Sequence, residues 1–174
     1  MKYILICLAF LCTFKLLAQE VTTLSRKESK FAKTLFPETA ITKELKIHAQ
    51  DTAGWDVLRA GDRIYQVWQQ DQLHGFLLST QAMGRYEYFD YLLAFDAELS
   101  VLGLTIITYR SSHGAAICQR RWLDQFIGYS GEELRLGKEI DSLSGATISA
   151  DALIRDLKRC HRLMIRLKEK DWIP

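Results

Sequence analysis

The chain has 174 residues and carries 23 Lys and Arg against 21 Asp and Glu, a net charge of +2. Its hydrophobic fraction of 48% and charged fraction of 25% are typical of a globular protein and exclude a disordered one. So small an excess of positive charge also excludes the basic surface of a nucleic-acid-binding protein. We therefore expect one folded domain that binds no nucleic acid.

The beginning of the chain is predicted to be a signal peptide, residues 1–18. Lys2 precedes an apolar run over residues 3–14, which is shorter than the ~20 residues of a membrane-spanning helix, and Ala18 stands where the sequence turns polar. The alternative is an uncleaved membrane anchor. Either prediction places the domain, residues 19–174, in the periplasm or on the outer face of the cytoplasmic membrane.

The remaining pattern predicts an α+β fold: an antiparallel β-sheet flanked by an N-terminal helix and C-terminal helices. Apolar spacing indicates a helix over residues 20–35, which ends before Pro37. Alternating β-branched and aromatic residues then indicate strands. Their ranges are 64–68, 75–79, 88–95 and 100–109, with a turn at 70–72. The apolar run 102–107 indicates a central strand that is covered on both faces.

Two helices are predicted after the sheet. The first covers residues 115–127, and the second begins near Ser149. An apolar stripe marks the second helix: Leu153, Leu157, Cys160, Met164 and Leu167. Its basic residues lie largely off that stripe: Arg155, Lys158, Arg159, Arg162 and Arg166. They are interpreted as a solvated surface or, alternatively, as a face that docks onto a membrane or an acidic partner.

The stretch from Asp141 to Ser149 combines an acid, four hydroxyls and a Gly-Ala pair directly before the second helix. Gly145 lets a ligand approach the backbone closely, and Ala146 keeps that approach open. Thr147 supplies a hydroxyl near the helix start, where unpaired N–H groups favour a phosphate. Ser149 is predicted to cap the helix. Asp141 would repel a free phosphate, so it is better explained as a recognition residue during modification of Thr147.

The pattern Asp141-x-x-Ser144-Gly145-Ala146-Thr147 resembles the flavinylation motif of the FMN-binding domain family. That family includes the C subunit of sodium-translocating NADH:quinone reductase and the G subunit of the Rnf complex. In these proteins a dedicated FAD:protein FMN transferase attaches FMN through its phosphate to the last threonine of the motif. The resemblance implies that Thr147 carries covalent FMN. It further implies an exported electron-transfer flavoprotein that exchanges electrons with redox partner proteins, membrane-bound ones included.

One segment departs from the family pattern. Where family members usually have a Glu-Thr-Pro-Gly type of segment close to the flavin ring, this chain has Ser111-Ser112-His113-Gly114. By resemblance, Ser112, His113 and Gly114 lie near the ring, where His113 can hydrogen-bond the flavin and shift its potential. The alternative is a turn histidine exposed to water. Trp122 is predicted either to stack on the ring or to pack in the core.

Two further groups of residues are interpreted structurally. Cys118 and Cys160 either form a disulfide or remain two buried thiols. A run of aromatic residues is expected to pack a sheet rather than bind a ring: Tyr86, Tyr88, Phe89 and Tyr91.

No nucleophile–histidine–acid set and no metal-ligand pattern stands out, so we expect an electron carrier rather than a stand-alone catalyst. Two alternatives stay open. One is a flavin-dependent reductase of a small extracytoplasmic acceptor. The other is a non-redox secreted binding module, in which the 141–149 stretch is only a helix cap.

Overall fold

A computed structural model describes residues 24–47 and 52–174 of the chain. Its elements, in chain order, are α2 (Arg26–Leu35), β1 (Ile41–Glu44), β2 (Arg63–Gln69), β3 (Gln72–Met83), β4 (Tyr88–Phe95), β5 (Val101–Thr108), η3 (Ala115–Cys118), α3 (Arg120–Leu123), η4 (Asp124–Phe126) and α4 (Thr147–Glu169). The strands form one antiparallel sheet in the order β1-β2-β3-β4-β5. This confirms the predicted α+β fold. The predicted signal peptide and residues 20–23 of the first predicted helix lie outside the described residues.

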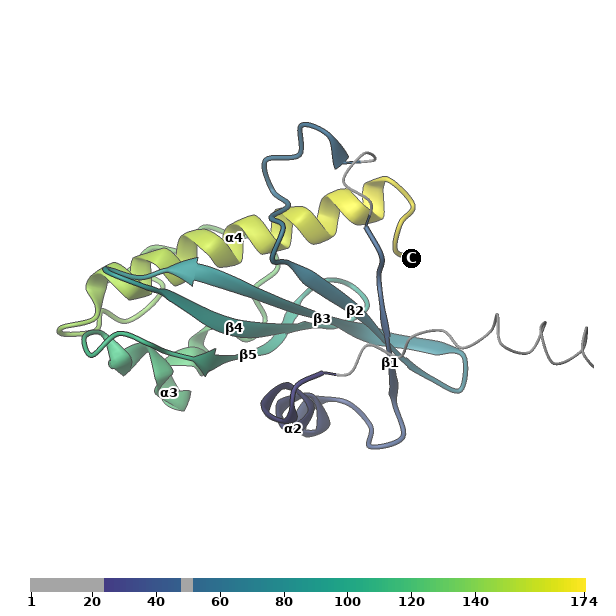
Figure 1. Ribbon diagram of the computed structural model, residues 1–174, viewed down its shortest axis with the longest axis horizontal. Helices are drawn as coiled ribbons and strands as arrows, with labels where there is room; N and C mark the ends of the chain where they lie inside the picture. The colour runs from purple at the N-terminus through teal and green to yellow at the C-terminus, as the bar shows by residue number, and fades with distance from the viewer. Residues whose placement is uncertain (1–23, 48–51) are drawn as a thin grey trace, which may run out of the picture.

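The sheet is covered on both faces. In Figure 1, α4 crosses one face and α2 lies against the other. The side chains of β4 alternate between the two resulting cores: Phe89, Tyr91 and Leu93 pack on the α4 side, and Leu92 and Ala94 pack on the α2 side. Burial on both faces explains why β4 reads as a nearly continuous apolar strand.

The predicted turn between β2 and β3 is confirmed. Gln70 and Asp71 both have positive φ, 47° and 63°, as the two central residues of a tight hairpin turn require. β3 itself is longer than the predicted 75–79. It pairs with β4 over its last eight residues, from Phe76 to Met83, so cross-strand pairing extends it beyond its apolar stretch.

The prediction that residues 102–107 form a central strand is wrong, because β5 is the last strand of the sheet. Helices still cover it: α2 packs on one face, and Val101 and Leu104 contact the core beneath α4. A continuous apolar run reports burial of the two faces and says nothing about the position of a strand within the sheet.

The helix before the sheet begins later than predicted. Ser25 is its N-cap, accepting a hydrogen bond from the N–H of Glu28, while the Glu28 carboxylate accepts one from the N–H of Ser25 at 2.8 Å. This capping box starts α2 at Arg26. The helix ends where Phe36 becomes extended ahead of Pro37, as predicted.

The single helix predicted over residues 115–127 is wrong. The segment divides into η3, α3 and η4, because Gln119 is extended (ψ 123°) between the first two. Ile117, Trp122 and Phe126 are buried as the apolar pattern indicated, whereas Ile127 is 50% exposed. The apolar face was therefore predicted correctly on a segment of the wrong regularity.

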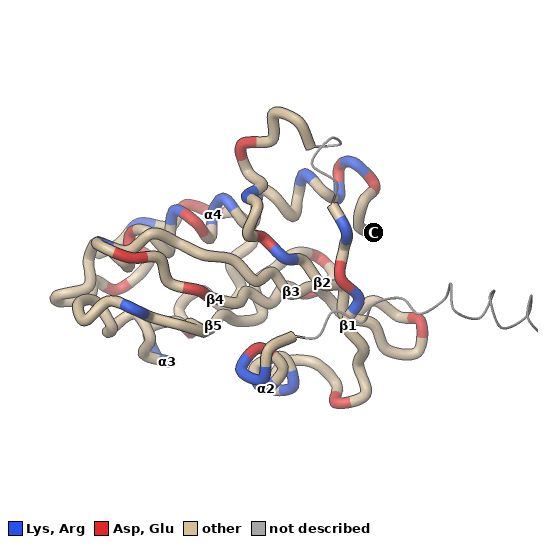
Figure 2. Tube along the Cα trace, viewed as in Figure 1, with Lys and Arg blue, Asp and Glu red and all other residues tan. Residues whose placement is uncertain are grey.

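The last helix, α4, has 23 residues and begins at Thr147, two residues before the predicted start. Its predicted apolar stripe is buried: Leu153, Leu157, Cys160, Met164 and Leu167. Its basic face is not uniformly solvated. Arg159 is buried, Lys158 pairs with Glu133 at 2.8 Å, and the Arg166 guanidinium lies 4.7 Å from the centre of the Trp55 ring. Figure 2 shows basic and acidic residues mixed along this helix rather than one positive stripe.

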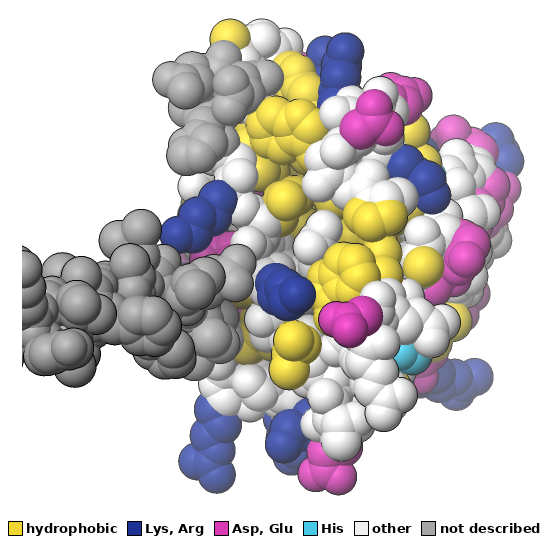
Figure 3. All heavy atoms as spheres, turned by 90° about the vertical axis from the view of Figure 1, so that its right-hand side faces the viewer, with side chains coloured by type: hydrophobic (Ala, Val, Ile, Leu, Met, Phe, Trp, Pro, Cys, Tyr) yellow, Lys and Arg dark blue, Asp and Glu magenta, His cyan; other side chains and the backbone are white. Residues whose placement is uncertain are grey.

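The end where β1 and the end of α4 lie, viewed directly in Figure 3, presents hydrophobic side chains among charged ones. Trp55 and Trp172 pack against each other there, with ring centroids 5.9 Å apart. Within residues 24–47 and 52–174, no helix is both long and apolar enough to cross a bilayer.

Candidate functional site

The predicted motif forms an exposed loop that leads into the first turn of α4. Gly145 has φ of 73°, and a Cβ built there would meet nothing within 4 Å, so a ligand can reach this backbone. Ala146 is the N-cap, is buried and provides no side-chain cap. Thr147 is exposed, and its hydroxyl forms no hydrogen bond within the described part of the chain. The helix thus begins with uncapped N–H groups beside a free hydroxyl.

The prediction that Ser149 caps this helix is wrong. Ser149 lies inside the first turn, is 2% exposed, and has its Oγ 2.9 Å from the Oη of Tyr109. That phenol also donates to the carbonyl oxygen of His113 at 2.6 Å. Because Ser149 faces the sheet, its hydroxyl joins the helix to the segment that follows β5.

The Ser111–Gly114 segment therefore lies beside the first turn of α4. Gly114 has φ of 86°, and a Cβ there would lie 2.5 Å from the Oη of Tyr109 and 3.0 Å from the Oγ of Ser149. Only glycine fits this position without displacing the hydrogen bond between those two side chains. The fold thus brings together the two stretches that the sequence analysis singled out.

The side chains of Ser112 and His113 are exposed. The Oγ of Ser112 lies 3.0 Å from Nδ1 of His113, and the His113 ring meets the Tyr86 ring edge-on at 6.2 Å. Tyr86 and Tyr88 are themselves 59% and 54% exposed, so the prediction that the whole aromatic run packs the sheet is correct only for Phe89 and Tyr91.

Trp122 is in the core, the second of its two predicted positions. Its ring is 3% exposed and packs edge-on against Phe126 at 5.1 Å. Its Nε1 donates to the carbonyl oxygen of Asp141 at 2.8 Å, and the N–H of Asp141 donates to the Oε1 of Gln125 at 2.9 Å. Trp122 and Gln125 thus hold the start of the motif in place, while the Asp141 side chain stays exposed.

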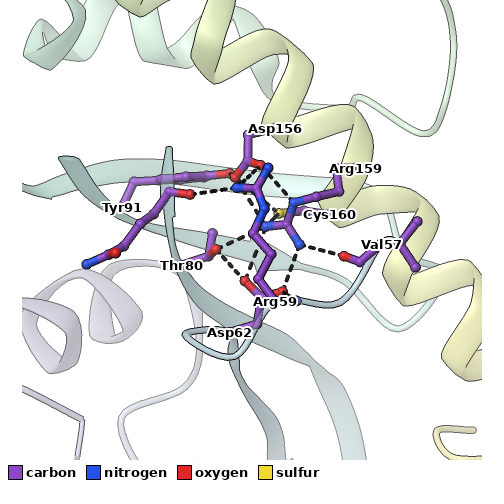
Figure 4. A network of polar contacts seen from close by, with 9 residues as sticks. Val57, Arg59, Asp62, Thr80, Tyr91, Asp156, Arg159 and Cys160 are labelled. Atoms are coloured by element: carbon purple, nitrogen blue, oxygen red, sulfur yellow. Dashed lines mark hydrogen bonds and ion pairs between the residues drawn. The ribbon is translucent and has the colours of Figure 1, made fainter. Parts of the chain in front are cut away.

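A buried polar network lies further along α4, shown in Figure 4. Its labelled members are Val57, Arg59, Asp62, Thr80, Tyr91, Asp156, Arg159 and Cys160. Arg159 is at the centre: its Nη1 lies 2.7 Å from Asp62 and its Nε 2.7 Å from Asp156, and all three side chains are at most 6% exposed. Nη1 also donates to the carbonyl oxygen of Val57 at 2.6 Å. The network fixes the 57–62 segment to α4.

The network sets the protonation of its members. Burial lowers the pKa of the Arg159 guanidinium, but its hydrogen bonds to Asp156 and Asp62 raise that pKa overall. Burial raises the pKa of the Cys160 thiol to about 12. Burial also raises the pKa of the Tyr91 hydroxyl, and the neighbouring Cys160 and Asp156 raise it further. The thiol is therefore protonated at neutral pH and is not a nucleophile.

This network was not predicted from the sequence. Arg159 was grouped with the basic surface of α4, although Asp156 three residues earlier is a suitable partner on the same helix. Asp62 is distant in sequence, and no local pattern could pair it with Arg159.

The two cysteines do not form a disulfide. Cys118 is an exposed free thiol and Cys160 a buried one, so the alternative of two buried thiols is correct for Cys160 alone. Among residues 24–47 and 52–174, no group of three His, Cys, Asp or Glu side chains is placed to hold a metal ion.

No protein family model matches this chain. No curated protein matches it either. Among solved structures, the chain is similar to the crystal structure of NqrC from Shewanella oneidensis, with 12% sequence identity and a TM-score of 0.49. That match covers 72% of this chain and 80% of the other. The evidence for a function therefore comes from the motif and its geometry.

Proposed function

We propose that this protein is an electron-transfer flavoprotein in which FMN is joined through its phosphate to the Oγ1 of Thr147. The observation that supports this most is the state of Thr147: an exposed, unbonded hydroxyl in the uncapped first turn of a 23-residue helix. A helix cap is the ordinary purpose of such a hydroxyl, and here the hydroxyl does not serve it.

The residues around Thr147 fit a phosphodiester. The first-turn N–H groups and the helix dipole stabilise negative charge at this end. Gly145 leaves the approach open, and the short Ala146 side chain is turned into the core. The Asp141 carboxylate is exposed and, within the described residues, has no ion-pair partner. An anchored backbone with a free carboxylate suits a residue that a modifying enzyme recognises.

The attachment is a group transfer from FAD, carried out by a separate FMN transferase. The Thr147 oxygen bonds to the phosphorus of the FMN half, the pyrophosphate bond breaks, AMP leaves, and the threonine proton is released. Once bound, the flavin supplies the electron-transfer chemistry. This chain supplies the attachment oxygen, the charge environment of the phosphate and the surface against which the cofactor is oriented.

The proposal includes an exported protein that acts in the periplasm or on the outer membrane face, where a tether prevents loss of the cofactor by diffusion. Its redox partners would be other proteins, some of them membrane-bound. The chain then acts as a carrier rather than a stand-alone catalyst.

Intact-mass measurement of the full chain, co-expressed and exported with an FMN transferase, tests the proposal. We expect a gain of one FMN minus one water, and flavin absorbance that remains after denaturation. Thr147→Ala should remove both. Ser142→Ala is the matched control, because Ser142 is an exposed hydroxyl of the same loop at a variable motif position; it should keep both.

The same cells should contain an acceptor that the transferase is known to modify. If that acceptor gains flavin and this chain keeps its unmodified mass, the proposal is wrong. A non-redox secreted module would then be the better explanation of the fold.

A further inference from the structure

The last residues of β3 have an open edge. β2 begins at Arg63, which pairs with Ser79, whereas β3 continues to Met83. Residues 80–83 therefore pair with β4 on one side and, within the described part of the chain, with no strand on the other. A cleft of about 530 Å³ lies in the place of the missing strand, bounded by the loop before β2 and by α4.

Unused backbone groups line this edge. Arg59, in the loop before β2, donates from Nη1 to the carbonyl oxygen of Gln81 at 3.0 Å, so Gln81 points its N–H and C=O toward the cleft rather than toward β4. Met83, two residues later, points its backbone groups the same way. Gly84 points the opposite way, because its N–H donates to the carbonyl oxygen of Glu87 at 3.0 Å. Within the described residues, the N–H of Gln81 and both backbone groups of Met83 have no partner in the loop or in α4.

One side of the edge is apolar and exposed. Side chains alternate along β3, so Ala82 faces α4, whereas Met83 and its cross-strand partner Tyr88 face the α2 side of the sheet. The cleft is lined from both faces because it lies at a strand edge. Met83 is 45% and Tyr88 54% exposed. The α2 side thus presents a pair of large apolar side chains beside the unused backbone groups.

The other side of the edge is cationic. Arg155 and Arg162 line the cleft and are two helical turns apart, so they lie on one face of α4, about 10.5 Å from each other along its axis. The Arg155 side chain is 69% exposed and has one ion-pair partner, Asp151 at 3.5 Å. Arg162 is exposed and has none within the described residues. Among the described lining carboxylates, Asp56 alone lies outside the buried network, so the exposed charge at the cleft is mainly positive.

We propose that this open edge binds an extended acidic segment of a partner protein, which adds to the sheet as a short strand beside residues 80–83. The backbone of the segment pairs with the unused backbone groups of β3. Its side chains alternate between the two sides. Acidic side chains on one side bind Arg155 and Arg162. Apolar side chains on the other side cover Met83 and Tyr88.

Arg59 explains why an acidic segment is favoured over other extended chains. Its side chain is 49% exposed and holds Asp156 at 2.6 Å as well as the Gln81 carbonyl oxygen. A charged side chain over an open edge hinders pairing with unsuitable strands. An acidic segment releases Arg59 from the carbonyl oxygen and binds the same guanidinium through a carboxylate, whereas a basic segment is repelled.

A partner bound at this edge lies beside the helix that begins at Thr147, since Ala152 of that helix also lines the cleft. Flavin attachment is not required for this binding. The full chain without flavin is therefore suitable for the test, and the result is independent of the fate of Thr147.

Fluorescence anisotropy tests the proposal, with the full chain titrated into a labelled short peptide in which Glu alternates with Val. We expect saturable binding that weakens as salt is added, and none for the same peptide with Lys in place of Glu. Two further peptides are N-methylated, one at every Glu and one at every Val. These nitrogens lie on opposite edges of an extended strand, so one peptide should lose binding and the other should keep it. Equal binding of the two would overturn strand addition.

Variants of the chain locate the binding. Arg155→Gln combined with Arg162→Gln should weaken it about tenfold. Arg121→Gln is the matched control, because Arg121 is exposed and has no ion-pair partner within the described residues, and it should bind normally. Met83→Pro should abolish binding, since it removes an N–H from the open edge and none from the β3–β4 ladder. Circular dichroism checks the fold of each variant.

Two outcomes would contradict the proposal at this step. Normal binding by folded Met83→Pro would show that the edge does not pair with the peptide, and equal losses in the arginine variants would show non-specific charge attraction. Phosphatidylglycerol vesicles distinguish the remaining kind of partner. If the chain binds these vesicles and not the peptide, and the double arginine variant does not bind them, α4 docks onto a membrane and strand addition is wrong.

Discussion

Two regions of α4 use similar side chains in opposite ways. Around Asp156 and Arg159, carboxylates, hydroxyls and a thiol are buried and hydrogen-bonded to one another. In the stretch from Asp141 to Thr147, an acid and three hydroxyls are exposed and make no side-chain hydrogen bond within the described residues. Polar groups that are saturated inside a protein hold its structure, whereas polar groups left free on an ordered scaffold are available for chemistry.

The comparison assigns different consequences to mutation. Changes in the buried network should alter the free energy of unfolding and leave flavin attachment intact in whatever fraction remains folded. Changes at Thr147 should abolish flavin attachment and leave the free energy of unfolding nearly unchanged.

Arg159→Met should have the largest effect on stability. It leaves Asp62 buried without its cation and leaves Asp156 with Arg59 alone, which costs about 3–5 kcal/mol. Arg155→Met is the matched control on the same helix, since its ion pair is solvent-exposed, and it should change stability by less than about 1 kcal/mol. Urea denaturation measures both values. Equal losses would contradict the structural role given to the network.

Gly145→Ala should destabilise the loop by about 1–2 kcal/mol, because alanine is strained at a φ of 73°. Gly61→Ala is the control. A Cβ at either glycine would meet nothing within 4 Å, but the φ of Gly61 lies outside the left-handed range. Thermal denaturation should show a loss for Gly145→Ala only. A similar Tm in the two variants would show that backbone conformation does not restrict residue 145.

His161 should make stability depend on pH. Burial lowers its pKa below 6.5 despite the opposing charge of Glu132, so the unfolded chain binds the proton more tightly than the folded one. This contribution to stability is present above about pH 6.5 and is lost as the pH falls from there toward the folded-state pKa. Denaturation curves of the wild type and of His161→Gln isolate it. Parallel pH profiles would contradict the prediction.

Thr147→Ala should leave stability within about 0.5 kcal/mol of the wild type, because its side chain is exposed and unbonded. Urea denaturation of unmodified protein provides this value. A loss near that of Arg159→Met would mean that Thr147 holds the helix start, and the contrast between the two regions would fail.

Local patterns predicted the fold well where one element decides the structure. The β4 strand, the hairpin turn at residues 70–71 and the buried stripe of α4 follow from alternation, turn chemistry and helical spacing. The same patterns failed where contacts between segments distant in the sequence decide the structure. The position of β5 at the sheet edge is an example, because strand order depends on pairing and not on composition.

In the candidate site, too, features that depend on local sequence were predicted and features that depend on distant residues were not. The motif identified Gly145 and Thr147 from local chemistry, and both lie where a ligand can reach them. It could not predict that Ser149 bonds to Tyr109, a residue 40 positions away in the chain.

Fragmentation mass spectrometry of the peptide that contains residues 141–149, taken from protein exported together with the transferase, tests the attachment of FMN to Thr147 directly. We expect the added FMN phosphate on Thr147 and on none of the three serines. FMN on Ser142, Ser144 or Ser149, or an unmodified peptide beside a modified control acceptor, would contradict it.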